Sequence, residues 1–173
     1  MIKNDIESSP IKILWLSRKA TICRTLNIFI YFLGFAFIYF VCSRPQTFMY
    51  SKNLTIFSFF VVSVTGLSFS STLILAARNI FKIKELATIY EFKPSAYYNF
   101  VGPFVFTALI WALLGIVSVI CGAFCLPNYV IRFVLSLNIV LSCLGIVNLC
   151  SLLVTNIQEL SKATGREIKK EMR

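Results

Sequence analysis

Long apolar stretches without a single charged residue dominate the pattern along this chain, and shorter segments rich in Lys and Arg separate them. A helix needs about 20 apolar residues to cross a hydrocarbon layer roughly 30 Å thick. Four stretches reach or approach that length, so the pattern predicts an all-α integral membrane protein with four transmembrane helices. The predicted spans are residues 26–42, 54–77, 100–124 and 133–154.

Composition agrees with the pattern, because 58% of the residues are hydrophobic, 14% are charged and the mean hydropathy is +0.81. Soluble globular proteins are about 25% charged. We expect residues 26–154 to form a single membrane domain between the tails 1–25 and 155–173. The first span could also be a signal peptide, but its apolar run is longer than the usual 7 to 15 residues, and we expect it to remain in the protein.

Short connections predict how the spans are paired, because short loops join antiparallel neighbours in helix bundles. Eleven residues separate the first two spans and eight separate the last two. The middle connection, residues 78–99, is longer. The four helices are therefore predicted to form two antiparallel hairpins.

The distribution of Lys and Arg predicts the orientation, since these residues are retained on the cytoplasmic side when loops are short. Fourteen of them lie in the two tails and the middle connection, together with all seven acidic residues. The other side has only Arg44, Lys52 and Arg132. Both termini are therefore expected in the cytoplasm.

Two segments on the cytoplasmic side have the pattern of short amphipathic helices. In residues 80–90 the apolar positions share one helical face, and Pro94 then ends the helix. Ser9 followed by Pro10 is a typical helix start, and it leads into a segment where Trp15 stands among basic residues. We expect both helices in the headgroup layer. Specific binding of anionic lipid calls for denser basic clusters than these segments show.

Small and weakly polar residues inside the spans mark candidate packing faces, because helices associate in lipid through close approach and hydrogen bonds. In the third span Gly115, Ser118 and Gly122 share a face with Thr107 and Trp111. A neighbouring helix is expected to pack closely on this face.

The fourth span presents a second such face, and its amides need hydrogen-bond partners in lipid. Both faces are expected either to pack within the chain's own bundle or to contact another copy or another subunit. A pore is disfavoured, because two amides on one helix make a poor selectivity ring. The residues of this second face are Asn138, Ser142, Gly145 and Asn148.

Serine and threonine residues in the second span spread around the helix instead of forming one face. Their hydroxyls can bond to carbonyls of their own helix, so they are compatible with close packing near Gly66. A groove for a lipid or polyisoprenoid would have a similar composition and remains an alternative.

Cysteines suggest two modifications. Cys42, Cys121 and Cys125 lie towards the outer ends of their spans, where a disulfide from Cys42 to one of the other two is possible in an oxidising compartment. Cys23 stands beside basic residues at the inner boundary, which is a position suited to palmitoylation.

Groups that carry chemistry are scarce in this sequence. It has no histidine, its spans have no carboxylate, and it lacks a phosphate-binding glycine loop and metal-ligand spacing. We expect no catalytic residues, no cofactor, no metal and no nucleic-acid partner. The expected partners are the lipid bilayer and other membrane-protein subunits or further copies of the chain.

These expectations combine into a non-enzymatic multi-pass protein that acts by lateral helix association, as an accessory or structural subunit of a membrane complex. The alternative is an oligomeric channel or carrier for a neutral or lipid-like solute. The tetraspan topology is shared with several groups, MARVEL-type proteins among them, whereas the outer loops are too short for those of tetraspanins and claudins.

Overall fold

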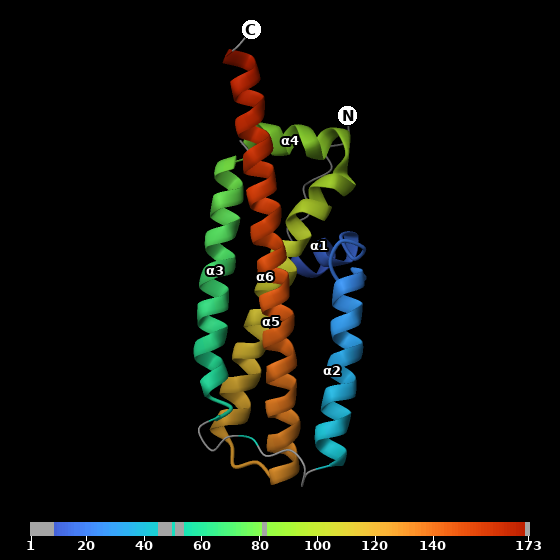
Figure 1. Cartoon of the computed structure of the whole chain (residues 1–173), viewed down its shortest axis with the longest axis vertical. Helices are drawn as coiled ribbons and strands as arrows, with labels where there is room; N and C mark the ends of the chain where they lie inside the picture. The colour runs from blue at the N-terminus through green and yellow to red at the C-terminus, as the bar shows by residue number, and fades with distance from the viewer. Residues whose placement is uncertain (1–8, 45–49, 51–53, 81–82, 172–173) are drawn as a thin grey trace.

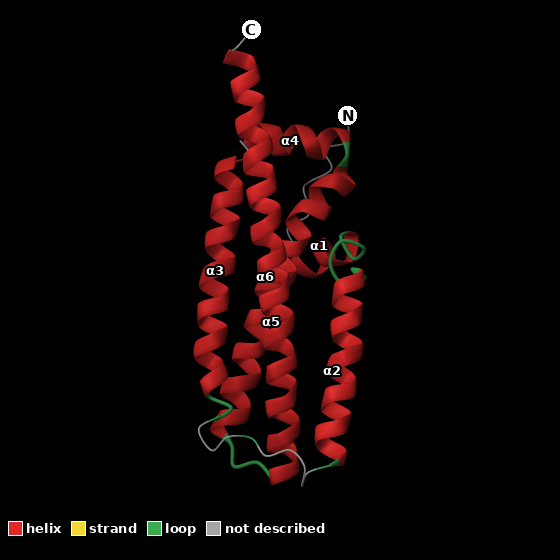
Figure 2. Cartoon of the chain, viewed as in Figure 1, coloured by secondary structure: helices red, strands yellow, loops and turns green. Residues whose placement is uncertain are grey.

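A computed structural model describes residues 9–44, 50, 54–80 and 83–171 of the chain. The described residues form α-helices joined by short loops and contain no strand (Figure 2). The helices are α1 (Pro10–Leu16), α2 (Thr25–Ser43), α3 (Ser58–Ile80), α4 (Ile83–Phe92), α5 (Pro94–Ala123) and α6 (Asn128–Glu171).

Four of these helices, α2, α3, α5 and α6, are long and apolar enough to cross a membrane. Each overlaps one of the four predicted spans, and together they confirm an all-helical architecture typical of a multi-pass integral membrane protein. Along the chain they run alternately in opposite directions (Figure 1). The 30 residues of α5 make a helix about 45 Å long, which exceeds the hydrocarbon thickness of roughly 30 Å.

The helix α6 is much longer than the predicted span 133–154. It has 44 residues, about 66 Å, and continues through most of the segment predicted as a separate tail. That segment has no proline, and Glu, Lys and Arg, which are strong helix formers, make up eight of its 19 residues. An ion pair between Lys162 Nζ and Glu159 Oε1 at 2.6 Å supports the helix across one turn. The charges mark the end of the apolar span, but they do not end the helix.

Three of the long helices, α3, α5 and α6, all pack against one another, and α2 lies outside this group against α6. In Figure 1 α6 stands between α2 and α3. The predicted packing of the first two spans as a hairpin is therefore not confirmed, because α2 has α6 as its main partner. The connection of residues 44–57 is long enough for α3 to begin on the far side of α6.

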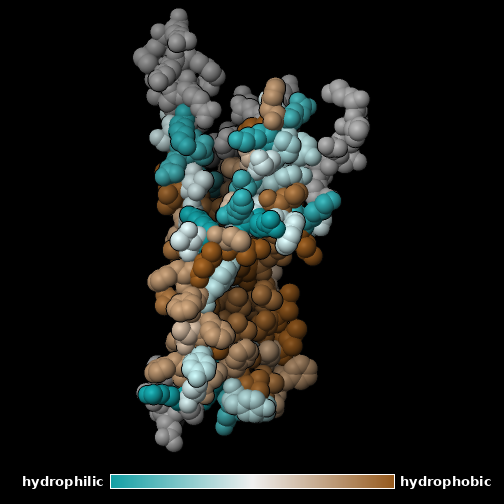
Figure 3. Space-filling model, turned by 90° about the vertical axis from the view of Figure 1, so that its right-hand side faces the viewer, coloured by the Kyte–Doolittle hydropathy of each residue, from teal (hydrophilic) through white to brown (hydrophobic). Residues whose placement is uncertain are grey.

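Both short helices pack against α5. The first, α1, begins at Pro10 with Ser9 as its N-cap residue, as predicted. The second, α4, ends at Phe92, and Pro94 then occupies the first turn of α5. In Figure 1 α4 lies at the end of the bundle from which α6 projects, which we call the α4 end, and α1 lies below α4, beside the start of α2. Figure 3 shows hydrophilic residues gathered at this end above a broad hydrophobic belt.

Candidate functional site

The predicted packing residues of the third and fourth spans are used inside the chain's own bundle. Of the seven, Gly122 is exposed at its end of α5. The other six are buried between helices, so they do not present an open surface to a second protein. The buried ones are Gly115, Ser118, Asn138, Ser142, Gly145 and Asn148.

Gly115 brings α5 close to α3. A Cβ atom at Gly115 would lie only 2.5 Å from Ser63 Oγ, so only glycine leaves room for this serine. The Ser63 hydroxyl donates a hydrogen bond of 2.6 Å to the backbone carbonyl of Trp111. At Gly122 the nearest atom, Phe57 Cβ, is at an ordinary contact distance of 3.8 Å. The small-residue face therefore allows close approach at Gly115 and not at Gly122.

The indole ring of Trp111 fills a slot between two glycines on different helices. A Cβ at Gly66 of α3 would fall within the van der Waals radii of the ring atoms. A Cβ at Gly145 of α6 would lie 2.7 Å from Trp111 Cζ2. Trp111 itself is 2% exposed. The Trp111 side chain thus joins α5 to α3 and α6. The sequence suggests this role for Trp111 and Gly145 only after their helices are known to be neighbours.

Asn148 finds its hydrogen-bond partner on α2. Its Nδ2 donates to Asn27 Oδ1 at 3.0 Å, and Asn27 Nδ2 donates to Asn148 Oδ1 at 3.2 Å. Asn27 Nδ2 also donates to the Thr21 carbonyl at 2.8 Å, and Asn148 Nδ2 to the Leu144 carbonyl at 2.8 Å. Both amides are buried. This reciprocal pair is a polar contact that holds α2 to α6.

Asn27 belongs to a seam that the sequence reasoning missed. The buried residues of α2 are Asn27, Gly34 and Val41, which recur at intervals of seven residues. A seven-residue repeat is the pattern of helices that pack along their length. A Cβ at Gly34 would lie 2.5 Å from Val140 Cγ1 on α6. The signal was present, because the first span has one amide and one glycine and they stand seven residues apart.

Two buried polar atoms have no hydrogen-bond partner among the described residues, namely Trp111 Nε1 and Asn138 Oδ1. The other end of the Asn138 amide donates a long bond of 3.4 Å to Ser118 Oγ. Ser142 Oγ donates to the Asn138 carbonyl within α6 at 2.8 Å. An unpaired buried polar group costs about 1–3 kcal/mol. The side-chain amide of Asn138 therefore makes fewer and weaker hydrogen bonds than that of Asn148.

Hydroxyls in the second span behave as predicted, because most of those described donate to carbonyls four residues earlier in α3. Residues with this bond are Thr65, Ser68, Ser70, Ser71 and Thr72. Ser63 instead bonds across to α5, and Asn156 Nδ2 of α6 donates to the Leu73 carbonyl of α3 at 3.3 Å. The hydroxyls of α3 thus serve the backbone and the packing.

Two apolar grooves flank α3 on its exposed sides. The groove between α3 and α5 has a volume of about 420 Å³, and Ser63, Ala112 and Gly115 line it together with larger apolar residues. The groove between α3 and α6 has a volume of about 350 Å³ and includes Gly66 and Trp111 in its lining. Both are suited to apolar occupants.

All six cysteines are free in the structure, including Cys42, Cys121 and Cys125. The disulfide therefore stays a prediction. Cys23 is exposed in the turn between α1 and α2, and its lipidation likewise stays a prediction. No three His, Cys, Asp or Glu side chains come together as a metal site within the described part of the chain.

Comparison with known proteins finds no match of this chain to a family model, to a curated protein or to a solved structure.

Proposed function

We propose that this chain is a non-enzymatic multi-pass membrane protein that acts by lateral helix association, as an accessory or structural subunit of a membrane complex. In this proposal both termini lie in the cytoplasm, and α1 and α4 lie in the headgroup layer of that side. The polar groups inside the spans include amides, hydroxyls and thiols, which can hold helices together, and the spans contain no charged residue or histidine that could activate a hydroxyl or thiol as a nucleophile.

The observation that carries the proposal is an exposed aromatic ridge on α2. Phe29, Phe32, Phe35 and Tyr39 are 59%, 73%, 75% and 68% exposed. Their spacing of three and four residues places them on the side of α2 away from the Asn27 seam. Of the four long helices α2 is the least enclosed. Helix association in lipid depends on van der Waals packing, and rigid aromatic rings offer large contact areas for it.

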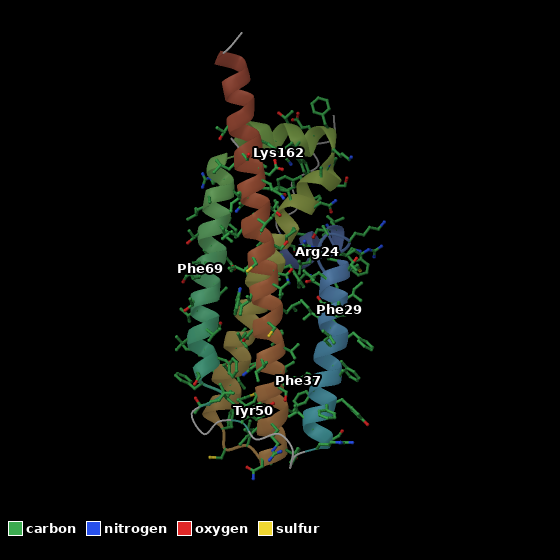
Figure 4. The ribbon with its side chains drawn as sticks, in the orientation of Figure 1. Arg24, Phe29, Phe37, Tyr50, Phe69 and Lys162 are labelled. Carbon is green, nitrogen blue, oxygen red and sulfur yellow. The ribbon has the colours of Figure 1, made fainter. Side chains whose placement is uncertain are left out.

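Native gels of the protein extracted in mild detergent test this proposal. We expect a species larger than the 19.6 kDa chain with its bound detergent. A variant with F32L and F35L, which keeps the apolar character but removes two rings, should shift the protein towards the monomer. The matched control V61L with F69L changes exposed residues of α3 (Phe69 is labelled in Figure 4) and should not. A wild-type protein that is strictly monomeric would contradict the proposal.

The proposed orientation has its own test. A tag fused to the C-terminal tail should stay inaccessible to a reagent added outside intact cells and become accessible after permeabilisation. Labelling of the tag in intact cells would contradict the orientation.

The alternative function, an oligomeric channel or carrier for a neutral or lipid-like solute, is favoured by the groove between α3 and α5. Ala112 lines this groove, while the neighbouring Leu113 is exposed. If the groove is a path, A112F should lower solute uptake into reconstituted vesicles and L113F should not. Equal uptake with A112F, L113F and wild type would exclude the groove as a path.

A further inference from the structure

The turn between α1 and α2, residues 17–24, carries three exposed cations. The guanidinium of Arg18 lies 4.7 Å from the centre of the Trp15 ring. Arg24, which is labelled in Figure 4, donates a hydrogen bond to the Ser151 hydroxyl of α6. Among the residues that the structure describes, no carboxylate pairs with Arg18, Lys19 or Arg24. Within the described part of the chain, the turn therefore presents three cations without an ion-pair partner.

The turn is firmly attached to the bundle. Ser17 and Thr21 are buried, and Ser17 occupies the space where a Cβ at Gly102 of α5 would stand. The Thr21 hydroxyl donates to the Ser17 carbonyl at 3.1 Å, and the Thr21 carbonyl accepts a bond from Asn27. Through Asn27 the turn connects to the amide of Asn148 on α6. The backbone that carries the three cations is thus fixed in place.

Exposed apolar side chains flank the same turn. Ile11 and Trp15 of α1 are 79% and 66% exposed, and Ile22 and Leu26 are exposed beside them. In Figure 3 the hydrophilic residues of this side meet the hydrophobic belt at the level of α1. Cations beside an exposed tryptophan at such a border are the arrangement that proteins place at the lipid headgroups.

The start of α2 adds to the positive potential of the turn. Arg24, the N-cap residue of α2, makes no capping hydrogen bond with its side chain, and the first turn of this helix has no acidic residue. The first backbone N–H groups of a helix lack intrahelical acceptors, and its N-terminal end carries a partial positive charge. The turn thus combines this helix end with Arg18, Lys19 and Arg24.

We propose that the turn between α1 and α2 binds the headgroup of an anionic phospholipid. Arg18, Lys19 and Arg24 surround the phosphate, and the acyl chains lie along Trp15 and Ile22. The charge of the turn selects an anionic over a zwitterionic lipid, since each cation at the headgroup level contributes to the attraction. In this turn Arg18 lies over the exposed indole of Trp15, and Lys19 and Arg24 are exposed on the same short segment.

Quenching of tryptophan fluorescence by brominated lipids tests this site directly. Because Trp111 lines the groove between α3 and α6, the measurement uses the W111F variant, in which Trp15 is the only tryptophan and reports on lipid at this turn. The protein is reconstituted in vesicles that mix phosphatidylcholine and phosphatidylglycerol, with bromine on one or the other lipid. We expect stronger quenching by brominated phosphatidylglycerol than by brominated phosphatidylcholine at equal fractions. Equal quenching by the two lipids would overturn the proposal.

Two charge variants separate this site from general attraction to a basic surface. R18Q with K19Q leaves the Arg24 bond to α6 in place and should lower the preference for phosphatidylglycerol by about fivefold per cation. R78Q with K93Q removes the same charge at the same end of the bundle and should leave the preference nearly unchanged. Equal losses in both variants would overturn the proposal, as would displacement of the lipid by millimolar inorganic phosphate.

Discussion

At the scale of single residues, the two amides of α6 have different surroundings although the sequence presents them alike. Asn148 shares two hydrogen bonds with Asn27, while the Asn138 oxygen has no partner among the described residues. Removing one member of a buried pair leaves the other unsatisfied, whereas removing a group that is already unsatisfied costs little. Substitutions of these two residues within α6 can therefore compare the two situations in the same helix.

We expect N148L to lower the free energy of unfolding by about 1–3 kcal/mol, because it leaves the Asn27 amide buried without its partner. N138L should be neutral or slightly stabilising. Unfolding by SDS in mixed micelles gives both values, and the double variant N27L with N148L should recover part of the loss. A cost for N138L equal to that for N148L would contradict the pairing.

The glycine slot around Trp111 leads to a second prediction at this scale. G66A places a methyl group against the indole ring, and such overpacking costs about 1–3 kcal/mol. G122A adds the same methyl group to the same bundle where the nearest atom is 3.8 Å away, so it should change stability by less than about 0.5 kcal/mol. The same SDS unfolding assay compares the two. Equal effects would show that Trp111 is not held between Gly66 and Gly145.

At the scale of the helices, the packing of α2 against α6 is the feature that differs most from the predicted hairpins. The helix α2 carries hydrophobic residues on all of its faces, so hydropathy alone does not identify the face that is buried. The seven-residue spacing of Asn27, Gly34 and Val41 does identify that face, but it does not say which helix covers it. Which helix covers this face depends on where α3 begins after the long connection that follows α2.

A disulfide trap checks this packing. The position of a Cβ at Gly34 lies 3.5 Å from Val140 Cβ, which is within the range for a disulfide. We expect G34C with V140C to form an intrachain bond on mild oxidation in membranes. G34C alone should not, which controls for the native cysteines of α6. F57C with G122C, with a Cβ separation of 3.8 Å, serves as a positive control between α5 and the residue that precedes α3. If G34C with V140C forms no disulfide while F57C with G122C does, the contact between α2 and α6 is contradicted.

Element ends show where sequence patterns are informative. Proline at positions 10 and 94 placed the start of α1 and the end of α4 correctly, because its ring restricts the backbone locally. No comparable local signal ends α6, which continues as a helix through most of the residues predicted as the cytoplasmic tail. The charged residues that end an apolar span are also good helix formers. Hydropathy predicts where lipid ends, and it does not predict where a helix ends.

At the scale of the whole molecule, the polar and small residues of the spans contact each other, and aromatic residues occupy the outside of α2. The sequence was sufficient to predict four spans, and six of the seven residues named on the two candidate faces are buried. It was insufficient to decide whether these faces contact the chain itself or another protein, since both need the same small and polar side chains. With most of these faces buried, the α2 ridge becomes the candidate partner surface.

Photo-crosslinking in native membranes tests this claim most directly. A photoreactive phenylalanine analogue replaces Phe32, which is 73% exposed on the ridge, or Val41, which is buried in the α2–α6 seam. Irradiation of the Phe32 variant should produce a discrete band larger than the chain that contains a second protein, and irradiation of the Val41 variant should produce only intrachain products. Adducts of Phe32 with lipid alone would contradict the account.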